Sequence, residues 1–172
     1  NVTIGTGSGT AINMANAGTS RTVTSDINLT GGTIEVTGNI VRTGGAGTEN
    51  ATVTLNGASL DLNGNSIGAS PQTITLAAQS GTLTGLGQLN GGGVLDKTTS
   101  GVLNMGDGNT YTGGTTVSGG TLSLASAGAV GTTGTITMNG GMLQFTASNT
   151  TDYTATGRLK LEDVLISSFD TN

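Results

Sequence analysis

The feature that most constrains the fold is a short pattern that returns at nearly constant spacing along the chain. Residues 52–62 (TVTLNGASLDL) align without a gap to residues 135–145 (TITMNGGMLQF). Residues 27–36 and, more loosely, 115–124 fit the same frame of alternating aliphatic and polar residues around a small-residue step. Alternation with a period of two is typical of a strand with one buried face. Each copy therefore predicts two short strands joined at a tight corner.

The spacing of these copies indicates how the strands are arranged. Ile74 follows Val53 at the same interval at which Ile136 follows Thr115, and one more equal step reaches Gly157. A constant step of about 20 residues is typical of one turn of a β-solenoid, in which successive turns stack about 4.8 Å apart. We therefore predict an all-β fold, a right-handed parallel β-helix with about 21 residues per turn and roughly eight turns.

Aliphatic residues at the alternating positions are expected to point inward and stack on their equivalents in neighbouring turns, with Thr facing outward. Gly-Gly and Asn-Gly steps would supply the corners, because glycine adopts backbone angles closed to other residues. A β-sandwich is the alternative, but sandwich cores usually contain aromatic residues, and these make up only 2% of this chain. The expected inward residues are Ile34, Val36, Val53, Leu55, Leu60, Leu62, Ile74, Leu76, Leu83, Leu122, Leu124, Ile136, Leu143 and Phe145.

Composition argues against most catalytic and cofactor chemistry. The chain contains no Cys and no His, so thiolate or imidazole metal sites, disulfides, haem ligation and the usual nucleophile–histidine pairs lack their common atoms. Five Lys and Arg against ten Asp and Glu leave no basic patch, so we expect no nucleic-acid partner. No apolar run is long enough for a transmembrane helix, so we expect no membrane insertion by this segment. We expect no cofactor and no enzymatic activity.

A denser motif lies in residues 92–124, GGVLDKTTSGVLNMGDGNTYTGGTTVSGGTLSL. It runs from a leucine strand with a lysine, through a Gly-x-Leu strand, to Asn-x-Tyr-x-Gly-Gly-Thr-x-Val and Gly-x-Leu. This order resembles the autotransporter-associated β-strand repeat, also called the passenger-associated transport repeat. The residues that carry the resemblance are Leu95, Lys97, Gly101, Leu103, Met105, Asn109, Tyr111, Gly113, Gly114, Thr115, Val117, Gly120 and Leu122.

The resemblance implies a segment of a large secreted bacterial surface protein, typically the passenger of a type V secretion system. In that family the repeat is associated with folding and export of the passenger and with its rod-like stalk, and it brings no catalytic residues. The motif residues would then be structural, and the chain would be secreted and lie outside the cell or on the bacterial surface. At 98–100 the chain departs from the family, because Thr-Thr-Ser stands where a Gly is common.

Several polar groups resemble parts of known sites, and we favour a structural interpretation for each. Residues 61–66 begin like a calcium loop but lack its Gly and its final Glu, and 106–109 lacks the repeated tracts of calcium-bound solenoids. We assign no metal. Tyr111 could stack on a sugar, but we expect it to cover a corner of the coil with its hydroxyl bonded to backbone. The charged residues at 158–163 are expected to form a solvated face with local ion pairs.

The final segment, 157–172, contains less Gly and Thr and is more apolar than the rest. We divide the chain into a β-solenoid domain, 1–156, and a C-terminal cap or inter-subunit contact segment, 157–172. Three interpretations stay open for this segment: a capping strand or helix, the first strands of a further turn, or a strand donated to a neighbouring subunit. The candidate residues for self-association are Leu159, Leu161, Val164, Leu165, Ile166 and Phe169.

These features predict a non-enzymatic structural module of a secreted bacterial cell-surface protein. It would serve as a stalk, scaffold or self-associating filament subunit, either associating end to end or continuing a longer solenoid. The alternative is an adhesin or carbohydrate-binding module that uses its Thr and Asn hydroxyls and amides to bind a host or matrix glycan. An acid-catalysed glycosidase or lyase is a third and less favoured hypothesis.

Overall fold

The computed structural model describes residues 2–5, 9–14, 22–44, 48–162 and 167–171. Within these ranges the chain forms strands and turns, and no described segment is a helix long and apolar enough to cross a membrane. The strands are β1 (Val2–Ile4), β2 (Thr10–Met14), β3 (Thr22–Leu29), β4 (Thr33–Val36), β5 (Asn39–Arg42), β6 (Thr48–Asp61), β7 (Thr75–Thr84), β8 (Leu95–Lys97), β9 (Val102–Met105), β10 (Thr115–Val117), β11 (Thr121–Leu124), β12 (Ile136–Met138), β13 (Met142–Phe145), β14 (Leu159–Leu161) and β15 (Ser168–Thr171).

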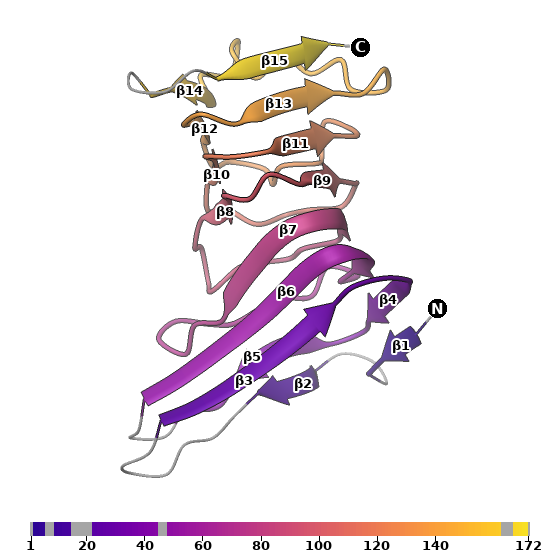
Figure 1. The fold of residues 1–172 in the computed structure, drawn as a ribbon, viewed down its shortest axis with the longest axis vertical. Helices are drawn as coiled ribbons and strands as arrows, with labels where there is room; N and C mark the ends of the chain where they lie inside the picture. The colour runs from indigo at the N-terminus through magenta and orange to yellow at the C-terminus, as the bar shows by residue number, and fades with distance from the viewer. Residues whose placement is uncertain (1, 6–8, 15–21, 45–47, 163–166, 172) are drawn as a thin grey trace.

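The strands pair with the equivalent strand of the next turn, and every pairing in the described chain is parallel. The long sheet has the order β1-β4-β6-β7-β9-β11-β13-β15, with β3 also on β6. A second sheet has the order β14-β12-β10-β8, and β2 pairs with β5. The result is a rod in which the turns stack along one axis (Figure 1).

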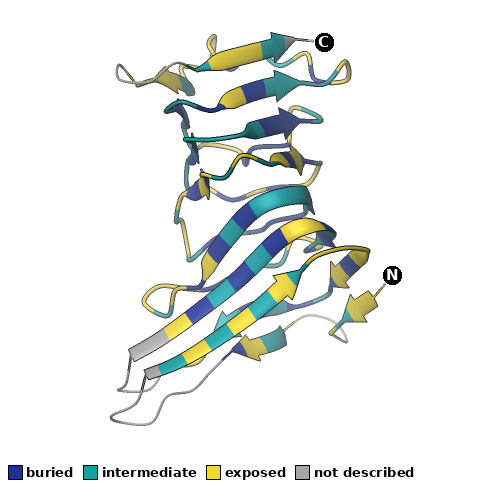
Figure 2. Cartoon of the chain, in the orientation of Figure 1, coloured by how far each residue is buried: buried dark blue, intermediate teal, exposed yellow. Residues whose placement is uncertain are grey.

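This arrangement confirms the predicted all-β parallel β-solenoid and excludes the sandwich alternative. The turns are longer and fewer than expected: there are about six, of about 23 residues each. Alternate residues point inward, as in β4 and β9, where exposed and buried positions alternate strictly. Figure 2 shows this alternation as bands along β6 and β7. Of the expected inward residues, only Phe145 is half-buried, and the others are buried.

The length of a turn changes along the rod. The change can be followed in one column of the long sheet, in which each residue pairs with the equivalent residue of the next turn. The residue numbers in this column are widely spaced at its start and more closely spaced at its end. We call β1–β7 the wide region and β8–β13 the narrow region, where the family motif lies. The members of the column are Val2, Ile34, Leu60, Leu83, Met105, Leu124 and Phe145.

Candidate functional site

The motif residues lie inside the narrow region and not on its surface. The aliphatic members Leu95, Leu103, Val117 and Leu122 are fully buried, and Thr115 occupies an inward position beside them. Three glycines form the closely packed corners between turns: a side chain at Gly113 would overlap the carbonyl oxygen of Gly93, one at Gly114 would lie 2.8 Å from that of Thr135, and one at Gly120 would overlap that of Thr99. No ligand in solution can reach these aliphatic side chains.

Lys97 occupies a position that is otherwise apolar. It pairs with Val117, which in turn pairs with Met138, and its side chain is fully buried. Its ammonium donates to the carbonyl and the hydroxyl of Thr99 and, at 3.5 Å, to the Gly119 carbonyl. Burial lowers the pKa of this ammonium from its usual value. Lys97 therefore holds a corner of the coil and is closed to substrates.

Asn109 links three successive turns through one buried amide. Its Oδ1 accepts the N–H of Leu86 at 2.9 Å, and its Nδ2 donates to the carbonyls of Gly106 and Ala129 at 2.9 and 2.8 Å. Such a side chain satisfies backbone groups that a tight corner leaves without ladder partners. The sequence indicated Asn109 only as a motif residue, and no pattern along the chain predicts these three partners.

Tyr111, two residues after Asn109, is also fully buried. The expectation of a backbone partner is wrong, because its hydroxyl bonds to the side-chain Oγ1 of Thr115 at 2.7 Å. Burial raises the pKa of the phenol to about 12. The next turn places Gly131 against this residue, where a side chain would overlap the Tyr111 carbonyl oxygen. A sugar cannot stack on Tyr111 in this position.

The two segments considered as metal loops line the same surface hollow, with residues 84 and 85 of the intervening turn between them. Asp61 and Asn63 line one surface hollow of about 490 Å³ together with Asp107 and Gly108, two turns further on. Asp61 already accepts the N–H of Asn63 at 2.9 Å, and Asp107 contacts the Ser126 hydroxyl. The described residues contain no group of three or more acidic side chains placed to hold a metal ion. The hollow is therefore a polar corner, and nothing else in the described residues around it indicates a bound ligand.

The C-terminal segment exposes the interior of the solenoid. Leu159 pairs with Ile136, Leu161 with Met138, and Phe169 with Leu143, so all three occupy inward positions of a further turn. Their partners are fully buried, whereas Leu161 is 64% exposed and Phe169 is 43% exposed, because no described turn covers them. The described part of 157–172 therefore continues the ladders as strands (Figure 1). Val164, Leu165 and Ile166 lie outside the described residues.

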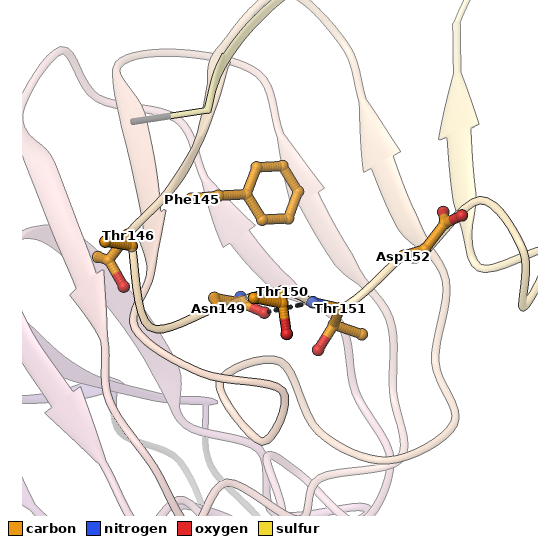
Figure 3. A pocket seen from close by; sticks show the side chains of 7 residues that line it. Phe145, Thr146, Asn149, Thr150, Thr151 and Asp152 are labelled. Atoms are coloured by element: carbon orange, nitrogen blue, oxygen red, sulfur yellow. Dashed lines mark hydrogen bonds between the residues drawn. The ribbon is translucent and has the colours of Figure 1, made fainter.

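A hollow of about 350 Å³ lies at the corner of the same end, between Phe145 and the 146–152 loop (Figure 3). Phe145 packs against Tyr153 with ring centroids 6.0 Å apart. Arg158 lies over the same Tyr153 ring and donates to the carbonyls of Gly134 and Val130 at 2.8 and 2.6 Å. The expectation of a solvated charged face is thus wrong for Arg158, which fastens this corner. Lys160 and Glu162 are exposed.

These observations define the class of the protein as a parallel β-solenoid, and the last strands that the structure describes leave inward side chains exposed. We call the surface formed by Leu159, Leu161 and Phe169 the terminal face. Comparison of the chain with protein-family models, with curated proteins and with solved structures returned no match.

Proposed function

We propose that this chain is a non-enzymatic structural module of a secreted bacterial surface protein, acting as a stalk, scaffold or self-associating filament subunit. The observation that carries the proposal is the terminal face, where inward residues of the last described strands have no other described residues stacked on them. The secreted location rests on the resemblance of residues 92–124 to the passenger repeat. The expectation that the chain is not an enzyme is supported by its composition and by the burial of its motif side chains.

The terminal face favours a further turn of the same chemistry as its occupant. Among the described strands, the last of each ladder, β14 and β15, pairs on one side only. Unpaired strand edges are templates for another strand, and exposed aliphatic and aromatic side chains gain free energy when a further layer covers them. At the other end, β3 pairs with β6 and with no other strand of the described chain, and its inward residues Ile27 and Leu29 are half-buried.

A second copy offers complementary charge at that other end. Asp26 on β3 is exposed. It pairs with Thr52, which pairs with Thr75, so these three residues form a row of outward-facing positions on successive strands. Further along the rod, the outward row of the second sheet runs from Asp96 through two threonines to the exposed Lys160 on β14. Head-to-tail stacking of copies would bring Lys160 beside Asp26 of the next copy. A contact between two different surfaces produces a filament when the rotation between successive copies does not close a ring.

The proposal is tested by a pair of matched substitutions. Phe169→Asp places a charge on the terminal face, whereas Val102→Asp places one on the side of the rod, and the two residues are 43% and 45% exposed. We expect the unaltered chain to form rods longer than a single solenoid in electron microscopy and to sediment as a distribution. Phe169→Asp should reduce it to monomers, and Val102→Asp should leave assembly unchanged. Equal behaviour of both variants would contradict the proposal.

Charge exchange tests which ends meet. Lys160→Glu should weaken assembly by placing a like charge beside Asp26 of the next copy, and Asp26→Lys in the same chain should restore it. Loss of assembly in both single variants without rescue in the double variant would show that the two ends do not meet in this register.

Glycan binding is the second candidate, and one row of side chains favours it. Regularly spaced hydroxyls and amides can hydrogen-bond a polysaccharide. A glycan array with the unaltered chain and with Asn104→Ala tests this function. Saturable binding that Asn104→Ala weakens would support it, and absence of any saturable signal would contradict it. The residues of this row, in register on successive strands of the long sheet, are Thr33, Ser59, Thr82, Asn104, Ser123, Gln144 and Asp170, of which Ser123 is buried and interrupts the exposed row.

A further inference from the structure

The chain contains four Asn-Gly steps, and a step of this kind can change chemically without an enzyme. The backbone nitrogen of the glycine can attack the side-chain carbonyl carbon of the asparagine, because glycine has no side chain to hinder the approach. The reaction requires an asparagine side chain that is free to turn and a glycine nitrogen that is not held by a backbone hydrogen bond. The steps lie at Asn56-Gly57, Asn63-Gly64, Asn90-Gly91 and Asn139-Gly140.

Hydrogen bonds to neighbouring turns restrain the first three of these steps. The nitrogen of Gly64 donates to a backbone carbonyl of the next turn at 2.7 Å. The Asn90 amide is held at both of its atoms, because its Oδ1 accepts the N–H of Ile74 at 2.8 Å and its Nδ2 donates to the Ile74 carbonyl at 2.9 Å. Asn56 lies within the β6 ladder and accepts the Ser80 hydroxyl at 3.0 Å. Each bond opposes the movement that the reaction needs.

The fourth step, at the corner between β12 and β13, is restrained differently. The backbone N–H of Asn139 donates to the Val117 carbonyl at 2.8 Å, but its side chain has no hydrogen bond among the described residues. The N–H of Gly140 donates to the hydroxyl of Ser167 at 3.1 Å. Ser167 is half-buried and lies directly before β15, the last described strand. The attacking nitrogen is therefore held by a hydroxyl group that can rotate away, and not by a backbone carbonyl.

We propose that Asn139 is a site of spontaneous deamidation and that the Ser167 hydroxyl slows this reaction. The Gly140 nitrogen forms a bond to Cγ of Asn139 and closes a succinimide ring. The side-chain nitrogen of Asn139 leaves as ammonia, together with the proton of the Gly140 N–H. Water then breaks one of the C–N bonds of the ring and yields aspartate or isoaspartate. No oxidant, reductant or cofactor takes part.

The product places a new carboxylate beside the last described turn. Asn139 and Glu162 occupy equivalent positions of successive turns, because their N–H groups donate to the carbonyls of the paired residues Val117 and Met138. Glu162 is exposed, and like charges at equivalent positions of neighbouring strands repel each other. Isoaspartate would also lengthen the backbone of this corner. Deamidation would therefore loosen β14, which carries part of the terminal face, and its effect on assembly rests on the proposed function.

Peptide mass spectrometry of the full chain, incubated in mildly alkaline buffer, would follow all the Asn-Gly steps over time. We expect Asn139 to convert fastest, to a mixture of aspartate and isoaspartate. Ser167→Ala removes the partner of the Gly140 N–H and should raise the rate at Asn139 about twofold or more. The rate at Asn63 should not change. The matched control is Ser168→Ala, because Ser168 is exposed and its side chain has no hydrogen bond among the described residues.

Two results would overturn the proposal. Conversion of Asn56, Asn63 or Asn90 at the rate of Asn139 or faster would show that the site is wrong. An equal rate at Asn139 in Ser167→Ala and in the unaltered chain would show that Ser167 does not restrain it, provided that circular dichroism finds both folded. Assembly is measured separately, by sedimentation of Asn139→Asp. Unchanged assembly of this variant would contradict the effect on the terminal face and leave the deamidation site established by its rate.

Discussion

The wide and narrow regions form one solenoid but hold their turns in different ways. In the narrow region, strands have three or four residues, and polar side chains are buried at the corners. In the wide region, β6 and β7 extend over 14 and 10 residues. One of its inner columns is aliphatic, because Ile40 bridges to Ile67, which bridges to Leu89.

The difference shows how ladder length and corner chemistry compensate for each other. A long parallel strand supplies many backbone hydrogen bonds to its neighbour, so a wide turn needs little help at its ends. A three-residue strand supplies few, and tight corners leave backbone groups that must find other partners. In the narrow region, the side chains of Lys97 and Asn109 bond to such backbone groups, and Tyr111 is buried with its hydroxyl bonded to Thr115. We therefore expect substitutions at narrow corners to cost more than their counterparts in the wide region.

Glycine substitution should give the largest effect when a close-packed corner glycine of the narrow region is compared with an open turn glycine of the wide region. In Gly113→Ala the added methyl group would overlap the carbonyl oxygen of Gly93 in the adjacent turn, which is backbone and cannot rotate away. We expect a loss of about 3 kcal/mol or more in the free energy of unfolding. The wide-region control is Gly31→Ala, where the methyl group meets nothing within 4 Å. Urea unfolding should show little change for the control, and equal losses would contradict the comparison.

The corner asparagines give the next largest effect. Asn109→Ala leaves the N–H of Leu86 and the carbonyls of Gly106 and Ala129 without this amide, and we expect a loss of about 2 kcal/mol. In the wide region, Asn65 is half-buried and donates to the carbonyls of Val36 and Leu62. Asn65→Ala should therefore cost only about 1 kcal/mol. Chemical denaturation of both variants measures the difference, and a larger loss for Asn65→Ala would reverse the comparison.

The same difference explains how far the fold could be predicted from the sequence. Nearly equal intervals between paired strands made the narrow region visible as a repeat, and inward residues such as Leu143 follow directly from alternation. The wide region showed copies of the pattern at 27–36 and 52–62 but hid the length of its turns, because its intervals are longer and differ from one turn to the next. The expected step from Val53 to Ile74 is accordingly wrong, since Val53 pairs with Leu76. Extending the short step over the whole chain therefore gave too many turns.

The candidate surfaces were predictable only in part. The repeat step reaches Gly157, so an inward position near Leu159 could be anticipated, but its exposure depends on what lies above it in space. The two bonds between Asn90 and Ile74 could not be anticipated, because Asn90 is indistinguishable in sequence from a turn residue beside glycines. Its role depends on meeting Ile74, which lies on the preceding turn. Contacts between turns of unequal length leave no periodic signal.

Tyr111 should make the narrow region sensitive to alkaline pH. Its folded-state pKa is raised from 10.0 to about 12, so the unfolded chain loses the proton first. The contribution of this group to stability is therefore complete below pH 10 and is lost as the pH rises toward 12. Tyr111→Phe should cost about 1 kcal/mol at pH 8 through the lost Thr115 contact and should flatten the alkaline decline. Urea unfolding between pH 8 and 11.5 measures both effects, with Ile67→Val as the wide-region control that leaves the decline in place.

Lys97→Met should have the smallest effect, and its pH dependence has the opposite sign. At pH 7 the lost contacts to Thr99 and Gly119 are offset by removal of a buried charge, so we expect a change within about 1 kcal/mol. Because burial lowers the folded-state pKa below the usual 10.5, the unfolded chain binds more protons between the two values. The unaltered chain should therefore gain stability relative to the variant as pH rises through that window. Leu76→Met, at an inward position of the wide region, should show no such gain, and a relative loss for the unaltered chain would mean that its oxygen ligands outweigh the burial of Lys97.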